Sequence, residues 1–207
     1  LIMNKIIGVV GFMNSGKGTV GDILNEYGYV SESFARPLKD AVSNIFGWPR
    51  SLLEGDTGFS RKWREEKDIW WSEKLGYDVT PRKILQQYGT ELFRKNFHDD
   101  IWILSMEYRL KAQPKNNFVI TDVRFPNEIK SIQKMNGKIV LVKRGPNPEW
   151  YDLALNHNRN SSLPKPDVHY SEWAWIGCAL DHTIENDGTM KDLSNKVENM
   201  IDTIFNK

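Results

Sequence analysis

The chain has 207 residues and a formal net charge of +1, from 28 lysines and arginines against 27 aspartates and glutamates. Hydrophobic residues make up 40% and aromatic residues 12%, enough for a packed core, which excludes a largely disordered protein. The balanced charge argues against a protein that coats nucleic acid or binds membranes through a polybasic surface.

The single cysteine, Cys178, excludes an intrachain disulfide and a cysteine zinc cluster, so we expect a reducing, cytoplasmic compartment. The apolar run near the N-terminus is too short for a secretory signal. No stretch reaches the roughly 18 apolar residues that a membrane span needs, so we expect no membrane partner.

The predicted elements alternate between strands and helices. Residues 5–10 form a β-branched run without polar alternation, which is typical of a strand buried on both faces of a parallel sheet. Further strands are expected over 29–34, 117–121, 138–142 and 182–185, and helices over 19–27, 38–46, 81–88, 101–110, 127–135 and 193–204, with 91–97 continuing the third helix or starting another. This order predicts an α/β protein with a parallel sheet flanked by helices.

Two segments interrupt this order. Residues 48–80 are rich in tryptophan and carry charges of alternating sign, which favours an inserted, solvent-exposed helix over a second domain. Residues 145–172 combine prolines with Asn and Ser clusters, and we expect a long, mobile excursion. The chain is therefore predicted to be one domain over residues 3–207, with a core of residues 3–47, 81–144 and 173–207.

The strongest motif is Gly11-Phe-Met-Asn14-Ser15-Gly16-Lys17, which has phosphate-loop spacing and lies between a predicted strand and a predicted helix. Glycines let the backbone wrap around phosphate oxygens, the helix N-terminus adds partial positive charge, and Lys17 adds a full charge. We therefore expect a three-layer P-loop NTPase fold that binds ATP through Gly11, Asn14, Ser15, Gly16, Lys17, Gly18 and Thr19.

Two alternatives remain for this motif. Gly16–Gly21 also fits the dinucleotide fingerprint, but there the first glycine should follow the strand directly, and Lys17 would have no role. The other alternative is an incidental glycine-rich turn.

The residue after Lys17 is Gly18, and the hydroxyl comes one position later, at Thr19. This form of the motif resembles nucleoside monophosphate kinases of the adenylate kinase type. In those kinases, Mg²⁺ is held largely through water and a strand-end aspartate.

Asp122 is such an aspartate, because it follows the predicted strand 117–121. Ligands gather at the carboxyl edge of parallel sheets, where Asp122 can hold Mg²⁺ through water and Arg124 can reach a phosphate. The alternative for Asp122 is a turn or helix-start residue without a metal.

Several further segments, in matching order over most of the chain, resemble bacteriophage deoxynucleoside monophosphate kinases. They are residues 34–40, 82–94, 100–102, 122–124, 167–172 and 184–189. The Leu-Gln86…Gly89-Thr90-Glu91…Arg94 and His169-x-Ser171-Glu172 patterns are more discriminating than the phosphate loop. Residues 48–80 and much of 145–166 resemble no segment of that family that we can assign.

The resemblance implies a kinase that transfers the ATP γ-phosphoryl group to a deoxynucleoside 5′-monophosphate (dNMP). Lys17, Asp122, Arg124 and Arg144 would act at the transferred phosphoryl group. The monophosphate would be bound by Lys39, Arg82, Arg94 and Arg124, and its base or sugar by Gln86 and Thr90. For Lys39 and Arg82 the alternative is solvated helix surface. For Arg94 it is an ion pair with Glu91 or Asp99.

In this interpretation, residues 145–172 form a lid that excludes water, with Arg144 and Arg159 reaching the phosphates. Asn186 and Gly188 would contact adenine, or else belong to a plain turn before the last helix. His169 is as readily a surface residue as a functional one. The tryptophans of 48–80 would fill a core or interface, although one could stack on the acceptor base.

Two other functions stay open. One is a P-loop kinase that acts on a modified base in phage DNA or on another small alcohol, although no broad basic stripe for stable nucleic-acid binding is present. The other is a non-catalytic nucleotide-binding module whose Trp-rich insertion contacts a partner. A homodimer is compatible with the sequence, and a phage-encoded enzyme would work in the host cytoplasm.

Overall fold

The computed structural model describes residues 4–206, so the two ends of the predicted domain, residues 1–3 and 207, lie outside the described residues. The chain divides into two compact units. Unit 1 comprises residues 1–33 and 108–207, and unit 2 comprises residues 34–107. None of the helices in the described part of the chain is long and apolar enough to cross a membrane.

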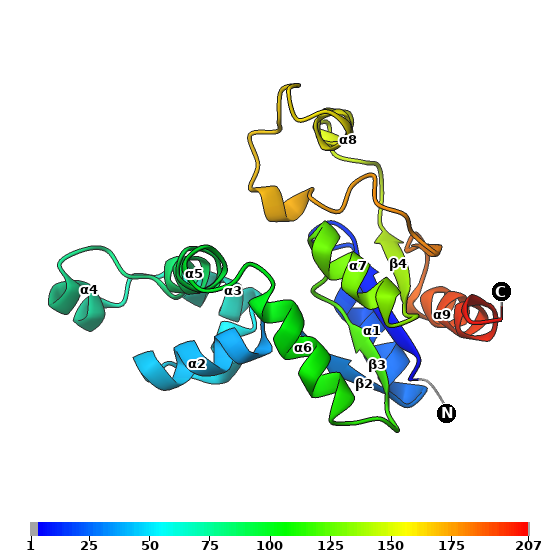
Figure 1. The fold of residues 1–207 in the computed structure, drawn as a ribbon, viewed down its shortest axis with the longest axis horizontal. Coiled ribbons are helices and arrows are strands. Elements are labelled where there is room, and N and C mark those ends of the chain that lie inside the picture. The colour runs from blue at the N-terminus through cyan, green and yellow to red at the C-terminus, as the bar shows by residue number, and fades with distance from the viewer. Residues whose placement is uncertain (1–3, 207) are drawn as a thin grey trace. The chain divides into compact units, whose positions relative to one another are not determined.

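Unit 1 is built on a five-stranded sheet whose neighbouring strands all run parallel (Figure 1). The strand order is β2-β3-β1-β4-β5. The strands are β1 Ile6–Val10, β2 Tyr29–Glu32, β3 Asn117–Ile120, β4 Lys138–Lys143 and β5 His182–Glu185. The predicted α/β fold with a parallel sheet is confirmed, and every predicted strand is present.

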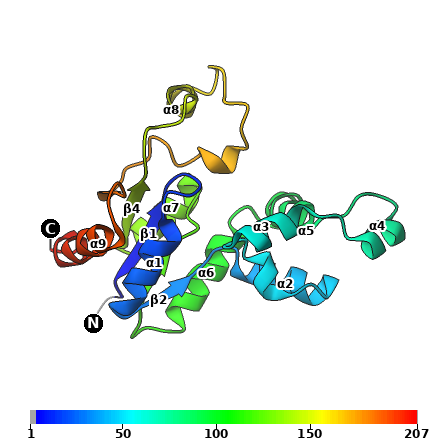
Figure 2. The ribbon, with the colours of Figure 1, turned by 180° about the vertical axis from the view of Figure 1, so that it is seen from behind.

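Helices cover both faces of this sheet. Apolar residues of α1 Lys17–Glu26 and α9 Met190–Ile204 pack with strand residues in one buried cluster. The other face is covered by α7 Pro126–Lys134, which lies opposite α1 when Figures 1 and 2 are compared. At Gly8 a Cβ atom would lie 2.7 Å from Ile132 Cδ1, so the glycine lets α7 approach the central strand. The central strand β1 is buried along its whole length, which explains its unbroken apolar sequence.

Parallel pairing brings the carboxyl ends of all five strands to one edge of the sheet. The phosphate loop follows β1, and the loop with Asp122 and Arg124 follows β3. Arg144 comes directly after β4, and Asn186 directly after β5. The sheet thus explains how residues distant in the sequence meet at one edge, where ligands of open α/β sheets bind.

The excursion that follows β4 within unit 1 contains a nine-residue helix, α8 Tyr151–Arg159, and a short 3₁₀ turn, η3 Tyr170–Glu172. The proline and asparagine clusters on either side of α8 do not predict this helix. Trp150, Tyr151 and Trp175 surround the ring of Phe12, with ring centroids at 5.6, 6.2 and 5.1 Å. The two ends of the excursion are therefore packed against the phosphate loop.

Unit 2 is helical. Its elements are α2 Arg36–Phe46, the 3₁₀ turn η1 Arg50–Leu53, α3 Gly58–Glu65, α4 Ile69–Leu75, α5 Pro81–Gln86, the π-helix η2 Gln87–Lys95 and the start of α6 Ile101–Lys111. The Trp-rich segment lies inside this unit together with the helices that flank it in sequence. The prediction of a single domain with an inserted segment stays a prediction.

Aromatic side chains of unit 2 gather around Phe46. Phe46 stacks on Trp48 at 4.5 Å and also contacts Trp71 at 4.8 Å. The Trp48 indole donates a hydrogen bond to Asp68, and the Trp71 indole donates one to the Phe46 carbonyl. Trp70, by contrast, is 58% exposed. The predicted role as core filler thus holds for Trp48, which is buried, whereas Trp71 is half-buried beside the same Phe46 ring.

Candidate active site

The phosphate loop has the backbone conformation that its glycines allow. Gly11 and Gly16 have φ angles of 149° and 103°, in the range that side-chain-bearing residues rarely adopt. At Gly11 a Cβ atom would lie 2.4 Å from the Val142 carbonyl oxygen of β4. Asn14 also has a positive φ of 60°, which asparagine tolerates better than most residues. The loop therefore closes tightly against the end of β4.

Lys17 begins α1 and folds its side chain back over the loop. Its Nζ atom donates hydrogen bonds to the carbonyl oxygens of Gly11 at 2.9 Å and Phe12 at 2.8 Å. The pKa of Lys17 is lowered to about 8, chiefly by burial and also by the Arg124 guanidinium, while the Glu172 carboxylate acts in the opposite direction. The amine is thus held against the phosphate loop, and it loses its own positive charge as the pH rises through about 8.

Asn186 fixes the loop from the end of β5. Its side-chain amide donates a hydrogen bond of 2.9 Å to the Ser15 carbonyl, and its backbone N–H donates to the Lys143 carbonyl at 2.7 Å. The Ser15 hydroxyl is buried and has no hydrogen-bond partner within residues 4–206. A buried hydroxyl without a partner is costly, so a ligand oxygen would be a favourable neighbour for it.

Asp122 has a supported carboxylate. Its Oδ2 accepts a hydrogen bond of 2.7 Å from the hydroxyl of Ser33, which follows β2. Arg109 pairs with the buried Glu32 and donates to the Ser33 carbonyl at 2.8 Å. The chain of contacts from Arg109 through Ser33 therefore holds Asp122 in place.

Arg124 is anchored at both its backbone and its side chain. The buried Glu128 carboxylate accepts hydrogen bonds from the backbone N–H groups of Arg124 at 2.8 Å and Phe125 at 3.0 Å. At the other end, the guanidinium Nη1 lies 2.7 Å from Glu172 Oε1 and 3.4 Å from the Ser171 hydroxyl oxygen. The structure brings Lys17 and Arg124 close enough for their charges to interact.

The predicted monophosphate-binding residues all belong to unit 2. Lys39 forms an ion pair of 2.6 Å with Glu54, a carboxylate that Arg50 also contacts. Arg82 pairs with Glu65. The sequence left solvated helix surface as the alternative for both cations. In the structure each of them is instead paired with a carboxylate.

Gly89 of the sequence motif lies in the π-helix, at a position where a side chain would be crowded. A Cβ atom on Gly89 would lie 2.9 Å from the Leu38 side chain of α2, and the Trp102 indole donates to the Gly89 carbonyl at 3.0 Å. Gln86 and Thr90 are exposed on this helix. Glu91 pairs with Lys95 at 2.8 Å.

Arg144, Arg159 and Gly188 contact neither the phosphate loop nor Asp122 through a hydrogen bond or ion pair within residues 4–206. Arg144 and Arg159 are exposed, and neither side chain forms a hydrogen bond or ion pair with another residue in 4–206. Gly188 lies in the turn before α9, where Thr189 and Asp192 form a capping box. This turn starts the last helix, and Asn186 in addition contacts the phosphate loop. Contact of Asn186 and Gly188 with adenine stays a prediction, as do the roles of Gly18, Thr19, Arg144 and Arg159.

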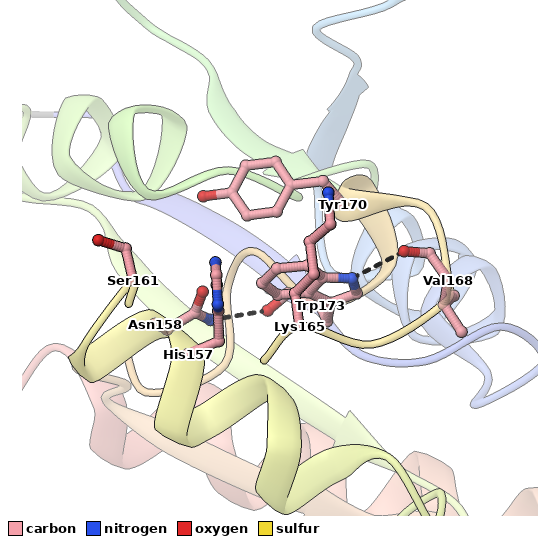
Figure 3. A pocket seen from close by; sticks show the side chains of 7 residues that line it. All are labelled: His157, Asn158, Ser161, Lys165, Val168, Tyr170 and Trp173. Carbon is pink, nitrogen blue, oxygen red and sulfur yellow. Dashed lines mark hydrogen bonds between the residues drawn. The ribbon is translucent and has the colours of Figure 1, made fainter. Parts of the chain in front are cut away.

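A cavity of about 350 Å³ lies within the excursion 145–172 and its immediate continuation (Figure 3). It is lined by side chains of α8, among them His157 and Asn158, and by others from 161–173, such as Tyr170 and Trp173. None of the residues that the sequence predicts for ATP, Mg²⁺ or the monophosphate lines it.

Comparisons with known proteins decide the family. A sequence profile described as deoxynucleotide monophosphate kinase matches residues 54–197, more than half of the chain. The chain belongs to the deoxynucleotide monophosphate kinase family. The predicted family and the predicted kinase activity toward deoxynucleoside monophosphates are therefore confirmed.

Two curated relatives of this deoxynucleotide monophosphate kinase family member carry matching names. A protein of Acanthamoeba polyphaga mimivirus, provisionally named a deoxynucleotide monophosphate kinase, is 31% identical over 67% of this chain and 74% of its own length. The deoxynucleoside-5′-monophosphate kinase of Escherichia phage T5 is 25% identical over 78% of this chain and 86% of its own length.

Among solved structures, a dephospho-CoA kinase from Campylobacter jejuni is similar over 99% of this chain and 100% of its own, at 17% identity and a TM-score of 0.44. A likeness at that level supports no conclusion about the site.

The family profile covers residues 54–80 and 145–166, which the sequence motifs leave unassigned. The phosphate loop precedes the matched range, so its interpretation rests on its motif and geometry.

Sequence reasoning missed the residues of this kinase that support its charged groups. Ser33 donates a hydrogen bond to Asp122, and Glu32 pairs with Arg109, which holds Ser33. Glu128 accepts a hydrogen bond from the Arg124 backbone. Glu128 had a detectable signal, because an acidic residue three positions into a helix that starts with Pro126 often caps its N-terminus. Ser33 had none, since its partner is 89 residues away in sequence.

Proposed function

We propose that the chain transfers the γ-phosphoryl group of ATP, bound at the phosphate loop, to the 5′-phosphate of a deoxynucleoside monophosphate, giving a deoxynucleoside diphosphate and ADP. The observation that carries the proposal is the arrangement around Lys17. Its amine lies over the loop carbonyls with Arg124 nearby, at the carboxyl edge of a parallel sheet. Two neighbouring cations repel each other, and phosphate oxygens between them would turn this repulsion into attraction.

On the donor side, the loop would hold the ATP phosphates through backbone N–H groups and the start of α1. The buried Ser15 hydroxyl, which finds no hydrogen-bond partner in the described part of the chain, supports this assignment, because a phosphate oxygen would satisfy it. Phosphoryl transfer needs alignment and charge neutralisation more than covalent help from the protein. Lys17 and Arg124 would stabilise the charge on the transferred group, and Arg144 would join them from the end of β4.

On the acceptor side, unit 2 would bind the monophosphate. Lys39, Arg82 and Arg94 offer cations that suit a phosphate, and Gln86 and Thr90 offer hydrogen-bonding groups that suit a base or sugar. The carboxylates that pair with Lys39 and Arg82 would give way to the incoming phosphate. Exposed ion pairs are weak, so this exchange costs little.

Magnesium fits the residues present. No group of three or more histidine, cysteine, aspartate and glutamate residues in 4–206 could form a protein cage for a metal. Mg²⁺ commonly takes one carboxylate and completes its shell with water and substrate phosphates, which matches the single strand-end Asp122. When bound, it would neutralise phosphate charge, and Asp122, oriented by Ser33, would hold it through water.

The excursion 145–172 would act as the lid that keeps water from the transferred phosphoryl group, since hydrolysis is the competing reaction. Its aromatic packing around Phe12 supports this role, because it ties the ends of the excursion to the phosphate loop. We expect no stable nucleic-acid partner, given the net charge of +1. For a phage-encoded member of the family, the host cytoplasm is the expected place of action.

A substrate panel tests the proposal. ATP and Mg²⁺ are supplied with dAMP, dGMP, dCMP, dTMP or a 5-hydroxymethylpyrimidine deoxynucleotide, and diphosphate products are separated by chromatography. We expect diphosphate from at least one acceptor, and loss of that product in Lys17→Ala. ATP consumption without any diphosphate would contradict the proposal, and so would a Lys17→Ala variant that keeps full activity.

A further inference from the structure

Within residues 4–206, the guanidinium of Arg124 forms hydrogen bonds through its Nη1 atom alone. Its Nη1 atom contacts Glu172 and Ser171, both on η3 at the end of the excursion. For Nε and Nη2 no hydrogen bond or ion pair with any residue in 4–206 is found. An arginine has five N–H donors in a planar fork, so donors remain available for a phosphate while one nitrogen stays on the carboxylate.

Ser171 has a defined orientation within this contact. The backbone N–H of Ser171 points to His169 Nδ1 at 3.3 Å, so this ring nitrogen is an acceptor. The Ser171 hydroxyl, 2.8 Å from the same nitrogen, must then donate its proton to it. Its oxygen lone pairs are thereby left for the Arg124 guanidinium. The His169-x-Ser171-Glu172 pattern thus forms an acceptor surface for one nitrogen of Arg124.

Glu172 precedes Trp173, whose hydrogen bonds to Val168 and Asn158 are drawn in Figure 3. Its neighbour Trp173 is 2% exposed and donates its indole N–H to the Val168 carbonyl at 3.0 Å. The Trp173 carbonyl accepts from the Asn158 amide of α8 at 3.1 Å. Tyr170 packs edge-on against the Trp173 ring with centroids 4.7 Å apart. The position of the carboxylate is therefore set by the excursion's own core.

The same pair lies beside the phosphate loop. Arg124 and Glu172 both affect the pKa of Lys17, in opposite directions, so both charges are near its amine. The side chains of Arg124 and Glu172 are 46% and 26% exposed. A pair that is exposed to this degree adds little to folding stability, which favours a role in placing the arginine over a structural role.

We propose that Ser171 and Glu172 are positioning residues for phosphoryl transfer: they hold one nitrogen of Arg124 so that the rest of its guanidinium faces the phosphates beside Lys17. This proposal rests on the proposed function of Arg124. Together with Glu128, which holds the Arg124 backbone, the two residues fix the arginine at both ends. Arg124 would then bind phosphate in full only when the excursion is docked.

A double-mutant cycle between Glu172→Gln and Arg124→Ala tests it. In the wild-type background, we expect Glu172→Gln to lower kcat/KM for transfer from ATP by about tenfold. In the Arg124→Ala background, the same change should alter kcat/KM by less than about twofold, because a residue that acts through Arg124 has nothing left to position. An equal loss in both backgrounds would overturn the proposal, since it would show an effect independent of the arginine.

Two controls complete the design. Glu149→Gln removes an exposed carboxylate of the same excursion that pairs with no residue in 4–206, and it should leave kcat/KM unchanged. The cycle is repeated with the dissociation constant of ATP, measured by tryptophan fluorescence in the absence of acceptor. This second readout keeps the proposal testable even if no dNMP is phosphorylated, and additive effects of the two substitutions on ATP affinity would contradict it.

Discussion

The side-chain amide of Asn186 donates a hydrogen bond of 2.9 Å to the carbonyl of Ser15, which is 171 residues earlier in the chain. The contact joins the residue after β5 to the middle of the phosphate loop. Next to it, a Cβ atom on Gly16 would lie 2.4 Å from the same Asn186 nitrogen. Loop and asparagine are therefore matched to each other, and each can be tested by substitution.

Asn186→Ala is expected to weaken nucleotide binding. The loop loses a hydrogen bond that fixes the Ser15 carbonyl, which is worth about 1 kcal/mol, or roughly a fivefold increase in the dissociation constant of ATP. Isothermal titration with ATP measures the effect. Asn199→Ala, on the exposed side of α9, is the matched control and should leave the constant unchanged. Equal affinity of the two variants would rule out this role for Asn186.

Gly16→Ala is expected to destabilise the protein, whereas Gly18→Ala is not. The first substitution forces a side chain into a φ of 103° and against Asn186, at a cost of about 1–3 kcal/mol. At Gly18 a Cβ atom meets nothing within 4 Å, and alanine favours the helix that contains it. Thermal unfolding without ligand separates the two. A Gly16→Ala variant with the wild-type Tm would contradict the geometry.

Nucleotide affinity should fall as the pH rises through about 8, the pKa to which burial lowers Lys17. Below that pH the amine is protonated and attracts phosphate, and above it the charge is lost. The dissociation constant of ATP should rise by at most about tenfold per pH unit in that range, as for a single titrating group. Lys17→Ala should bind weakly with no such dependence. The same pH dependence in Lys17→Ala would assign the titration to another group.

Substitutions on unit 2 should separate the two substrates kinetically. Lys39→Gln and Arg82→Gln are expected to raise KM for the dNMP by about tenfold or more, through loss of charge-assisted contacts to its phosphate. KM for ATP should change little. Lys83→Gln removes an exposed cation beside Arg82 and serves as the control. If either substitution raised only the KM for ATP, the assignment of unit 2 to the acceptor would be wrong.

The sequence alone predicts most of the fold because its signals are local. The apolar run of β1, the glycines of the phosphate loop and the amphipathic pattern of α9 each specify their structure within a few residues. The helix α8 escapes prediction because prolines and asparagines on both sides of it read as loop. The sequence predicts helix over 81–88 and 91–97, but not that residues 87–95 form a π-helix.

Within the candidate site, the sequence predicts the charged residues but not what holds them. Lys17, Asp122 and Arg124 follow from their motifs and strand ends. Their supports, such as Ser33 for Asp122 and Glu172 for Arg124, come from residues that are 89 and 48 positions away. Such pairings arise only in the folded chain: no local pattern marks Ser33, and the His169-x-Ser171-Glu172 pattern does not say which residue Glu172 contacts.

The most direct test of the central claim follows the transferred phosphoryl group itself. The enzyme is incubated with Mg²⁺, ATP labelled at its γ-phosphorus and the dNMP that the panel identifies. The products are separated by chromatography, and the label in each product is measured. We predict that the label appears in the β-phosphate of the deoxynucleoside diphosphate, in equal amount to the ADP formed. Label that goes to inorganic phosphate to the same extent with and without dNMP would contradict the account.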